Sequence, residues 1–460
     1  MNKKTDTIAA VSTPRGESGI AVIRLSGPES QTIMQKIFNP AKKISKPQSH
    51  RVYHGWIAKK GEKIDEVMLS FFLSPHSYTG EDMAEISAHG SPFVSKRILE
   101  LLVKQGARLA QPGEFTKRSF LNGKMDLSQA EAVADLIHAK TEASRRVALY
   151  QLEGNLSQKL SEFSQQLLQA CSFLELELDF AEEDIEFTSM KDLKKMITRI
   201  DTELKKFLES FERGRLCREG VRMAIIGSPN VGKSSILNCL VEKERAIVTE
   251  IAGTTRDTIE DVLDIEGILF TITDTAGLRE VQDPIEKEGV RRAEKALEEA
   301  DMVLLVVDGS RPLNREDKAI IDKIEQKEKN QLVIINKSDL SPKVSVEEMK
   351  KLSGSKEILS VSALKKTGIN TLIDSLKHLV ISGDLPEEGE LLLTRERHKQ
   401  AILRTREHLH QALNALTENM SQEFIAFDLR QALDALGEIS GKKTTDDILN
   451  FIFSEFCVGK

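Results

Sequence analysis

One nine-residue stretch has the glycines, lysine and serines needed to bind the phosphates of a nucleotide. The stretch is GSPNVGKSS (227–235), and it fits the pattern Gly-x-x-x-x-Gly-Lys-Ser. It follows the apolar run VRMAII, and its last two serines begin the helical stretch SSILNCLV. This is the strand–loop–helix setting in which such loops bind phosphates. The Lys233 ammonium would then contact the outer phosphates, and the Ser234 hydroxyl would bind Mg²⁺.

Three later segments indicate that the base is guanine. DTAG (274–277) ends the apolar run ILFTIT and would place a carboxylate near the metal and a glycine near the γ-phosphate. NKSD (336–339) supplies Asp339, whose carboxylate can accept from both N1–H and the exocyclic amine of guanine, a pair of donors that adenine lacks. The backbone of SAL (362–364) could contact the guanine oxygen. In order and spacing the four segments resemble the translation-factor-related GTPases.

The segments that contact the γ-phosphate are unusual. Leu278 stands where Ras-like enzymes carry the glutamine that orients the attacking water. Because an aliphatic side chain cannot hold water, another residue must do so. In VTEIAGTTRDT (248–258), Thr255 is the expected second hydroxyl ligand of Mg²⁺. The carbonyls of TEIAG and the Asn230 side chain are neutral oxygens, which suit a monovalent cation beside the phosphates.

The residues expected to contact GTP thus come from five segments of the chain. They are Asn230, Val231, Gly232, Lys233, Ser234, Ser235, Thr249, Glu250, Ile251, Ala252, Gly253, Thr254, Thr255, Asp274, Thr275, Ala276, Gly277, Asn336, Lys337, Asp339, Ser362, Ala363 and Leu364.

The elements that must position these residues lie within 219–380. Short apolar runs (VRMAIIGS, GILFTITD, DMVLLVVDG, QLVIINKS, EILSVSA) alternate there with helical stretches such as GINTLIDSLKHLV. That alternation predicts a mostly parallel sheet with helices on both faces.

The flanking regions have other patterns. Residues 1–122 mix β-rich runs with one helical stretch, which is typical of an α/β or α+β domain. Residues 123–218 have apolar residues at helical spacing, and Ser128 with Glu131 predicts a capping box. Residues 381–460 resume the helical pattern. The simplest architecture is a nucleotide-binding domain inserted into a helical domain made of two separated segments.

Composition restricts the class of protein. The chain has 460 residues, of which 40% are hydrophobic and 30% charged, as in globular proteins of roughly three domains. No apolar run approaches the roughly 18 residues needed to cross a bilayer, and four scattered cysteines fit a reducing cytoplasm. The net charge is −7, yet residues 1–60 carry eleven Lys/Arg against three Asp/Glu. This basic region is either an ordinary solvated face or a surface for a polyanion.

Beyond the nucleotide motifs, the chain resembles the MnmE (TrmE) family of tRNA-modification GTPases over its whole length. The resemblance is carried by TPRGESGIAVIRLSG, SYTGEDMAEISAHG, QPGEFTKRSFLNGKMDLSQAEAVADLI and the terminal FCVGK. It implies a homodimer built on an N-terminal domain with a folate-binding fold, and a Ras-like G domain carried by the helical domain. It also implies a heterotetramer with the FAD-dependent protein MnmG, which together with this chain would place a carboxymethylaminomethyl or aminomethyl group on carbon 5 of uridine 34 in certain tRNAs.

The same resemblance assigns roles to individual residues. K⁺ would be held by Asn230, Thr249, Ile251 and Thr254 between two G domains. Glu286 would orient the water through a bridging molecule, which fits the absence of a glutamine at Leu278.

A 5-substituted or methylene tetrahydrofolate would be bound by Arg24, Glu85, Lys124 and Lys460, because cations can pair with its glutamate tail and a carboxylate with its pterin edge. Glu85 and His89 could alternatively form a metal pair.

The end of the chain, FSEFCVGK, carries a thiol near this expected folate site. It is not a prenylation signal, since Gly459 is not aliphatic and Lys460 is not an accepted last residue. The Cys457 thiolate could add to a pyrimidine ring, or the thiol could only pack.

Two other classes of function are considered. A GTP-switched ribosome-assembly or RNA-binding factor would be expected to append a module such as a KH domain, and no G-x-x-G clamp follows the insertion. The other class is a scaffold whose shape is set by the nucleotide while another subunit performs the chemistry. This class is close to a tRNA-modification GTPase, because the family's partner holds the flavin.

Overall fold

In the computed structural model the chain divides into two compact units, each described here by itself. The first comprises Met1–Ile137, Gln151–Asp201 and Ala401–Lys460, and the second His138–Tyr150 and Thr202–Gln400. The structure describes residues 6–14, 16–59, 61–179, 189–243, 261–265, 267–274, 297–326, 330–355, 357–380, 389–454 and 456–460.

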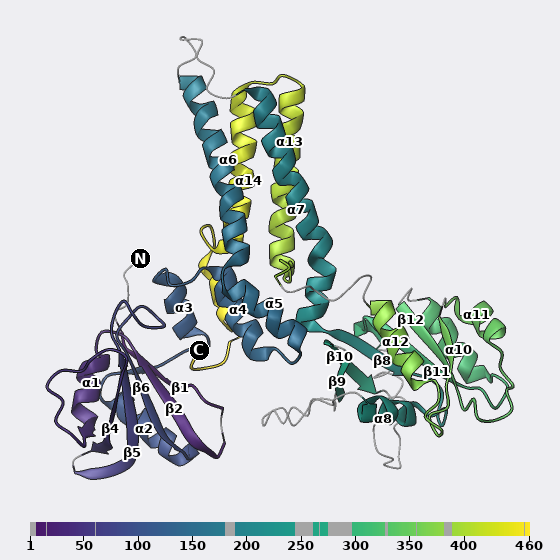
Figure 1. The fold of residues 1–460 in the computed structure, drawn as a ribbon, viewed down its shortest axis with the longest axis horizontal. Coiled ribbons are helices and arrows are strands. Elements are labelled where there is room, and N and C mark those ends of the chain that lie inside the picture. Colours follow the sequence, from purple (N-terminus) through teal and green to yellow (C-terminus); the bar gives the residue numbers. More distant parts are fainter. Residues whose placement is uncertain are drawn as a thin grey trace. The chain divides into compact units, whose positions relative to one another are not determined.

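The N-terminal part of the first unit is built on a seven-stranded sheet of order β3-β4-β5-β6-β2-β1-β7 (Figure 1). Neighbouring strands are antiparallel, except that β1 and β7 are parallel. The strands are β1 (Ile8–Val11), β2 (Ser18–Ser26), β3 (Phe38–Pro40), β4 (Arg51–Lys59), β5 (Glu62–Phe72), β6 (Met83–Gly90) and β7 (Arg108–Leu109).

The two faces of this sheet differ. Side chains alternate between the faces along each strand, and one face packs on α1 (Ser30–Ile37) and α2 (Pro92–Lys104) in a core that includes Ile23, Leu69 and Ile86. On the other face, α3 (Glu114–Leu121) covers only one end, where Phe115 packs on Ala10 and Met83. The rest of that face is left without a helix in the described residues.

Helices from two separated segments of the chain, 127–219 and 396–454, contribute to the first unit. They are α4 (Leu127–His138), α6 (Asn155–Asp179), α14 (Gln422–Ser440) and α15 (Asp446–Ser454), with the parts of α7 (Met190–Glu219) and α13 (Glu396–Thr417) that fall in it. The structure corrects one expected helix start. The capping box at α4 is formed by Asp126 and Gln129, since each side chain accepts from the other's backbone N–H at 3.0 Å. Ser128 and Glu131 lie inside the helix and are buried.

The second unit contains a six-stranded sheet of order β13-β12-β11-β8-β10-β9 (Figure 1). All neighbours are parallel except β9 and β10, so the predicted mostly parallel sheet is confirmed. The strands are β8 (Val221–Ile226), β9 (Asp261–Ile265), β10 (Ile268–Asp274), β11 (Met302–Asp308), β12 (Asn330–Asn336) and β13 (Ile358–Ser360).

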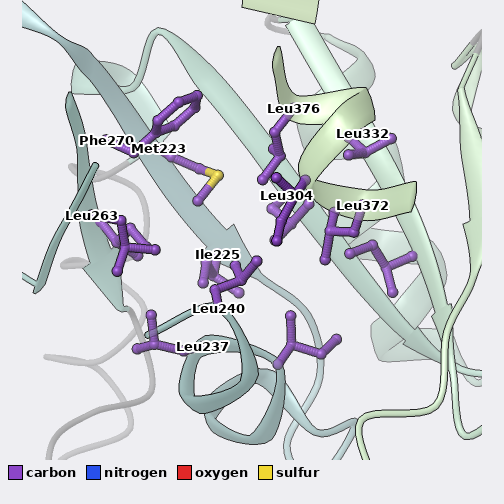
Figure 2. Packing of buried hydrophobic residues seen from close by; sticks show 14 of the residues in the cluster. Met223, Ile225, Leu237, Leu240, Leu263, Phe270, Leu304, Leu332, Leu372 and Leu376 are labelled. Carbon is purple, nitrogen blue, oxygen red and sulfur yellow. The ribbon is translucent and has the colours of Figure 1, made fainter. Parts of the chain in front are cut away.

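Helices cover both faces of this sheet, as expected. Figure 2 shows Leu237 and Leu240 of α8 (Lys233–Lys243) and Leu372 and Leu376 of α12 (Ile369–Val380) packing on the strands from one side. On the opposite face, α10 (Arg315–Glu325) and α11 (Val346–Ser353) contribute buried residues such as Met349. The short α5 (Glu142–Leu152) contributes Val147, which packs on Cys217 and Leu392. The loops at the carboxyl ends of the parallel strands are thus held by a well-packed core.

The structure bears on the cysteines and on the length of the apolar helices. All four cysteines are free; Cys171, Cys217 and Cys239 are buried, and Cys457 is exposed. Among the described residues, no helix has the length and apolar content needed to cross a membrane.

Candidate functional site

The phosphate loop joins β8 to α8 and holds its own lysine. The loop turns through Asn230 and Gly232, both in the left-handed region with φ of +62° and +98°. The Lys233 ammonium donates to the carbonyls of Gly227 and Ser228 at 2.8 and 2.9 Å, which fixes the positive charge at the start of α8. The N–H groups at a helix start favour an anion at the same place. The loop therefore has the shape and charge of a phosphate site.

Gly232 is required by close packing against the next loop. A Cβ on Gly232 would lie 2.2 Å from Asn336 Nδ2, which no side chain could tolerate without displacing Asn336. Asn336 ends β12, and its Nδ2 donates to the carbonyl of Val231 at 2.9 Å while its Oδ1 accepts from Ala363 N at 3.1 Å. The side-chain amide of Asn336 thus connects NKSD to the phosphate loop and to SAL.

The expected guanine acceptor is held ionised. Ser362 Oγ donates to Asp339 Oδ1 at 2.5 Å, and this hydrogen bond lowers the pKa of the Asp339 carboxyl. Lys337, at φ +64°, places its ammonium 2.6 Å from Asp308 Oδ2. An ionised carboxylate can accept two parallel hydrogen bonds, as the N1–H and amine of guanine require.

A buried carboxylate that sequence reasoning missed supports the phosphate loop. Ser228 Oγ donates to Asp317 Oδ1 at 2.5 Å, and Arg311 donates to Asp317 Oδ2 at 2.6 Å. Burial alone would raise the pKa of Asp317, but the hydrogen bonds from Arg311, Ser228 and the Asn314 backbone outweigh it, so the pKa lies below its usual range. The pattern Asn314-x-x-Asp317 could have indicated the helix cap that Asp317 forms, but not its contact with Ser228.

The C-terminal tail is docked on the N-terminal sheet of the first unit. Gly113 N donates to the carbonyl of Cys457 at 3.4 Å, and Phe115 N donates to the Lys460 carbonyl at 3.3 Å. Ser12 Oγ donates to the carbonyl of Gly459 at 3.1 Å. Residues 457–460 thus lie between β1 and the start of α3. Docking of this tail is expected from the apolar sequence before it.

Only glycine fits at position 459. Its φ is +98°, and a Cβ would lie 2.6 Å from the Val11 carbonyl oxygen and 2.8 Å from Ser12 Cα. Both are backbone atoms of the first strand and the residue after it, so no side-chain rotation could relieve the overlap.

Arg24 connects the tail to Glu85. Its Nε and Nη2 lie 2.9 and 2.8 Å from Glu85 Oε1, and its Nη1 donates to the Gly459 carbonyl at 3.3 Å. The guanidinium also lies over the rings of Tyr78 and Phe115, at 5.4 and 5.7 Å from their centroids. Such stacking and paired hydrogen bonding leave the guanidinium little freedom.

The other candidate residues are placed less tightly. Burial, and next the charge of Arg24, lower the pKa of the Lys460 amine, with Glu85 and Cys457 acting in the opposite sense. The Lys124 ammonium is exposed and donates to the Pro75 carbonyl at 3.2 Å.

The metal pair considered for Glu85 and His89 is not formed. Glu85 pairs with Arg24, and His89 Nδ1 lies 2.7 Å from Asp65 Oδ1. No cluster of three or more potential metal-ligating side chains occurs in the described ranges.

Comparison with known proteins identifies the family. The family model described as "GTP-binding protein TrmE N-terminus" matches residues 7–124, and the model described as "MnmE helical domain" matches residues 127–457. The chain belongs to the MnmE family. The family resemblance and the multidomain α/β and helical fold expected from sequence are thereby confirmed, and the chain is a GTP-hydrolysing enzyme.

Curated members of the MnmE family match nearly end to end. The tRNA modification GTPase MnmE of Natranaerobius thermophilus is 42% identical over 457 residues, which is 99% of each chain. The protein of that name from Aquifex aeolicus is 44% identical over 456 residues, covering 99% of this chain and 100% of that one.

Solved structures match over part of the chain. The FeoB G-domain from Methanococcus jannaschii is 27% identical and covers 35% of this chain and 97% of its own, with a TM-score of 0.27. Era from Aquifex aeolicus bound to GDP and AlF₄⁻ is 29% identical, covering 41% of this chain and 66% of that one, with a TM-score of 0.28.

Part of the candidate set lies outside the described residues. This applies to Leu278, to Glu286 and to both segments that flank the γ-phosphate: Thr249, Glu250, Ile251, Ala252, Gly253, Thr254, Thr255, Thr275, Ala276 and Gly277. Asp274 ends β10, in register with Ile225 of β8 beside the phosphate loop. Ser234 and Ser235 are exposed in the first turn of α8. The described residues thus include those expected to contact the base, together with the phosphate loop.

Proposed function

We propose that this chain uses GTP hydrolysis to modify tRNA at carbon 5 of the wobble uridine, position 34. It would act with an FAD-dependent MnmG-type partner in a heterotetramer and add a carboxymethylaminomethyl or aminomethyl group. The observation that carries the proposal is that one chain combines a guanine-type nucleotide site with a cysteine-bearing tail docked at the Arg24–Glu85 pair. The names of its full-length relatives support the tRNA substrate.

In the nucleotide site, Lys233 would bind the outer phosphates and Asp339 would select guanine. The hydroxyls of Ser234 and Thr255 would hold Mg²⁺, which neutralises charge on the phosphates when bound. K⁺ would be held by Asn230, Thr249, Ile251 and Thr254, whose neutral oxygens suit it, at an interface between two G domains. Glu286 would orient the attacking water where Leu278 cannot.

At the tail, the donor set fits a folate. Arg24, Lys124 and Lys460 would supply cations for the glutamate tail of a folate. Arg24 also donates to Glu85 and to the Gly459 carbonyl, and Lys124 to the Pro75 carbonyl. The second oxygen of Glu85 could accept from a pterin edge. A 5-substituted or methylene tetrahydrofolate would supply one-carbon chemistry when bound. Cys457, whose thiol is exposed, would act as the nucleophile.

A homodimer built on the N-terminal domain is supported by the sheet face that carries Arg24 and Glu85. Met68 and Val52 are 47% and 59% exposed, and Ile20 is 63% exposed at the end of the same face. Soluble proteins rarely leave such a face uncovered, and a second copy of this chain would cover it.

The test is mass spectrometry of wobble uridines in tRNA from a strain that lacks the gene. Complementation with the wild-type gene should restore the modified uridine, whereas Glu286→Ala should not, although it should bind GTP normally. Unmodified uridines in the wild-type complement, together with a defect in ribosome assembly, would favour the alternative of a GTP-switched assembly factor.

A second measurement tests the cation. GTP hydrolysis by the purified protein should be faster in KCl than in NaCl at equal ionic strength, and the difference should shrink in Asn230→Ala. Equal wild-type rates in the two salts would contradict the K⁺ assignment.

A further inference from the structure

We propose that one edge of the N-terminal sheet is a docking surface for the phosphate backbone of tRNA. This edge, called the basic edge below, comprises Lys36 at the end of α1, Lys42, Lys43 and Lys46 in the loop between β3 and β4, and Arg51 at the start of β4. The inference rests on the proposed function, which makes tRNA the substrate, and it adds where the tRNA is held.

The stretch of chain that carries the basic edge has charges of a single sign. No acidic residue occurs between Glu29 and Glu62, a stretch that contains the five residues of the basic edge together with Lys59 and Lys60. The chain as a whole has a net charge of −7, so this positive field is local and not a property of the entire surface. A local field of one sign steers and holds a polyanion.

The cations of the basic edge have no carboxylate partner among the residues that the structure describes. Elsewhere in the N-terminal domain, arginines are neutralised by carboxylates: Arg24 by Glu85, and Arg108 and Arg118 by Asp6 and Glu114. All five cations of the basic edge are exposed, and none forms an ion pair within the part of the chain that the structure describes. Their charge is therefore available to a ligand.

The loop that carries the three lysines is held in place by the strands next to it. Ala41 N donates to the His54 carbonyl at 2.9 Å, and His50 N donates to the Phe71 carbonyl at 2.7 Å. Gln48 N donates to the Tyr53 hydroxyl at 2.8 Å. These bonds fix the first residue of the loop and its last three residues to β4 and β5. Cations on a fixed backbone lose less conformational freedom on binding than cations on a free chain.

The chemistry of the basic edge favours nucleic acid over an acidic protein. Protein interfaces are centred on buried aromatic or aliphatic anchors, and between residues 41 and 51 the large apolar side chain is Ile44, which packs into the core. Contacts with a phosphate backbone need cations without apolar anchors and are independent of base sequence. β3 lies at the end of the strand order, so no further strand of the sheet covers this side.

The test compares two triple variants of the full chain that change charge equally. Lys42→Gln/Lys43→Gln/Lys46→Gln removes three charges from the basic edge. Lys191→Gln/Lys195→Gln/Lys205→Gln removes three exposed charges from α7, where Lys195 and Lys205 already pair with Asp192 and Glu209 at 3.3 and 3.8 Å. Binding of a fluorescent tRNA transcript with a wobble uridine is measured by anisotropy across roughly 50–200 mM KCl, the range in which phosphate contacts dominate the salt dependence.

We expect the basic-edge variant to bind tRNA at least about tenfold more weakly, with the slope of log K against log salt reduced by about two. The α7 variant should bind as the wild type does, and both should hydrolyse GTP at the wild-type rate, which confirms that they fold. Equal losses in the two variants, or no loss in the first, would overturn the proposal. Wild-type tRNA binding with lost capture of the MnmG-type partner would also overturn it and assign the surface to a protein. A wild-type protein that binds no tRNA would instead count against the proposed function.

Discussion

Replacing Gly459 by alanine should undock the C-terminal tail while leaving both units folded. Gly459 has φ +98°, and the added Cβ would lie 2.6 Å from the Val11 carbonyl oxygen. Because that atom belongs to the backbone of β1, the tail must move instead. Moving it breaks the hydrogen bonds that the Gly459 carbonyl accepts from Ser12 and Arg24.

The expected cost follows from these contacts. A non-glycine residue in the left-handed region costs about 1–2 kcal/mol, and each lost hydrogen bond contributes about 0.5–1.5 kcal/mol. With two hydrogen bonds lost, the docked tail should therefore be destabilised by about 2–5 kcal/mol. At about 1.4 kcal/mol for each factor of ten, the docking equilibrium should fall by between about thirtyfold and about four-thousandfold.

Amide hydrogen exchange measures this equilibrium directly. The N–H groups of Gly113 and Phe115 donate to the Cys457 and Lys460 carbonyls, so they are protected by the tail itself. In Gly459→Ala these two amides should exchange faster by the same factor, because exchange through local opening reports the free energy of that opening. Amides in β5 and β6, which do not contact the tail, should exchange at wild-type rates.

Gly106→Ala is the matched control. Gly106 has φ +111°, yet nothing lies within 4 Å of an added Cβ, so alanine there adds backbone strain without overlap. In the Gly106→Ala variant, amide hydrogen exchange at Gly113 and Phe115 should occur at the wild-type rate. If Gly459→Ala protected these amides as well as the wild type does, the tail would not be held by the contacts described above.

Further outcomes concern the nucleotide site and the thiol. Asp317→Asn should weaken GDP binding roughly tenfold in calorimetry, because Ser228 loses a charged acceptor worth about 1–3 kcal/mol; unchanged affinity would exclude a role in shaping the loop. Since the folded pKa of Asp317 lies below 3.8, its contribution to the free energy of unfolding is complete above that pH and is lost as the pH falls toward the folded pKa, so Asp317→Asn should flatten the acid limb of a stability–pH curve. Lys233→Ala should abolish measurable GTP binding in the same titration. Cys457→Ser should abolish tRNA modification while GTP hydrolysis continues, and full modification would leave the thiol a packing role only.

The nucleotide-binding fold could be predicted from sequence because its signals are local. The apolar runs before 227, 274 and 336 end in the glycine, carboxylate and amide that the chemistry needs, and the structure confirms the parallel sheet that brings those ends together. The pairing of Asn336 with Val231 follows from the order of β8, β11 and β12 in that sheet.

Contacts between distant segments could not be predicted in this way. Ser228 and Asp317 are 89 residues apart, and Ser12 and Gly459 are 447 apart. No periodicity connects such positions, and their partners are set by packing. The prediction of the capping box at α4 was wrong for a different reason. Ser128 and Asp126 are both good caps, and the helix begins at the earlier one because Gln129 can return the hydrogen bond.

The docking of the tail makes the Arg24 site depend on both ends of the chain. Arg24 and Glu85 are paired within the N-terminal sheet, but Arg24 Nη1 donates to the Gly459 carbonyl, which lies 435 residues further along the chain, after α14 and α15. A contact of such long sequence separation forms late, because the intervening loop must close first. We therefore expect Lys460 to reach Glu85 only when the first unit is assembled, so that a partly folded chain would present Arg24 without the C-terminal tail.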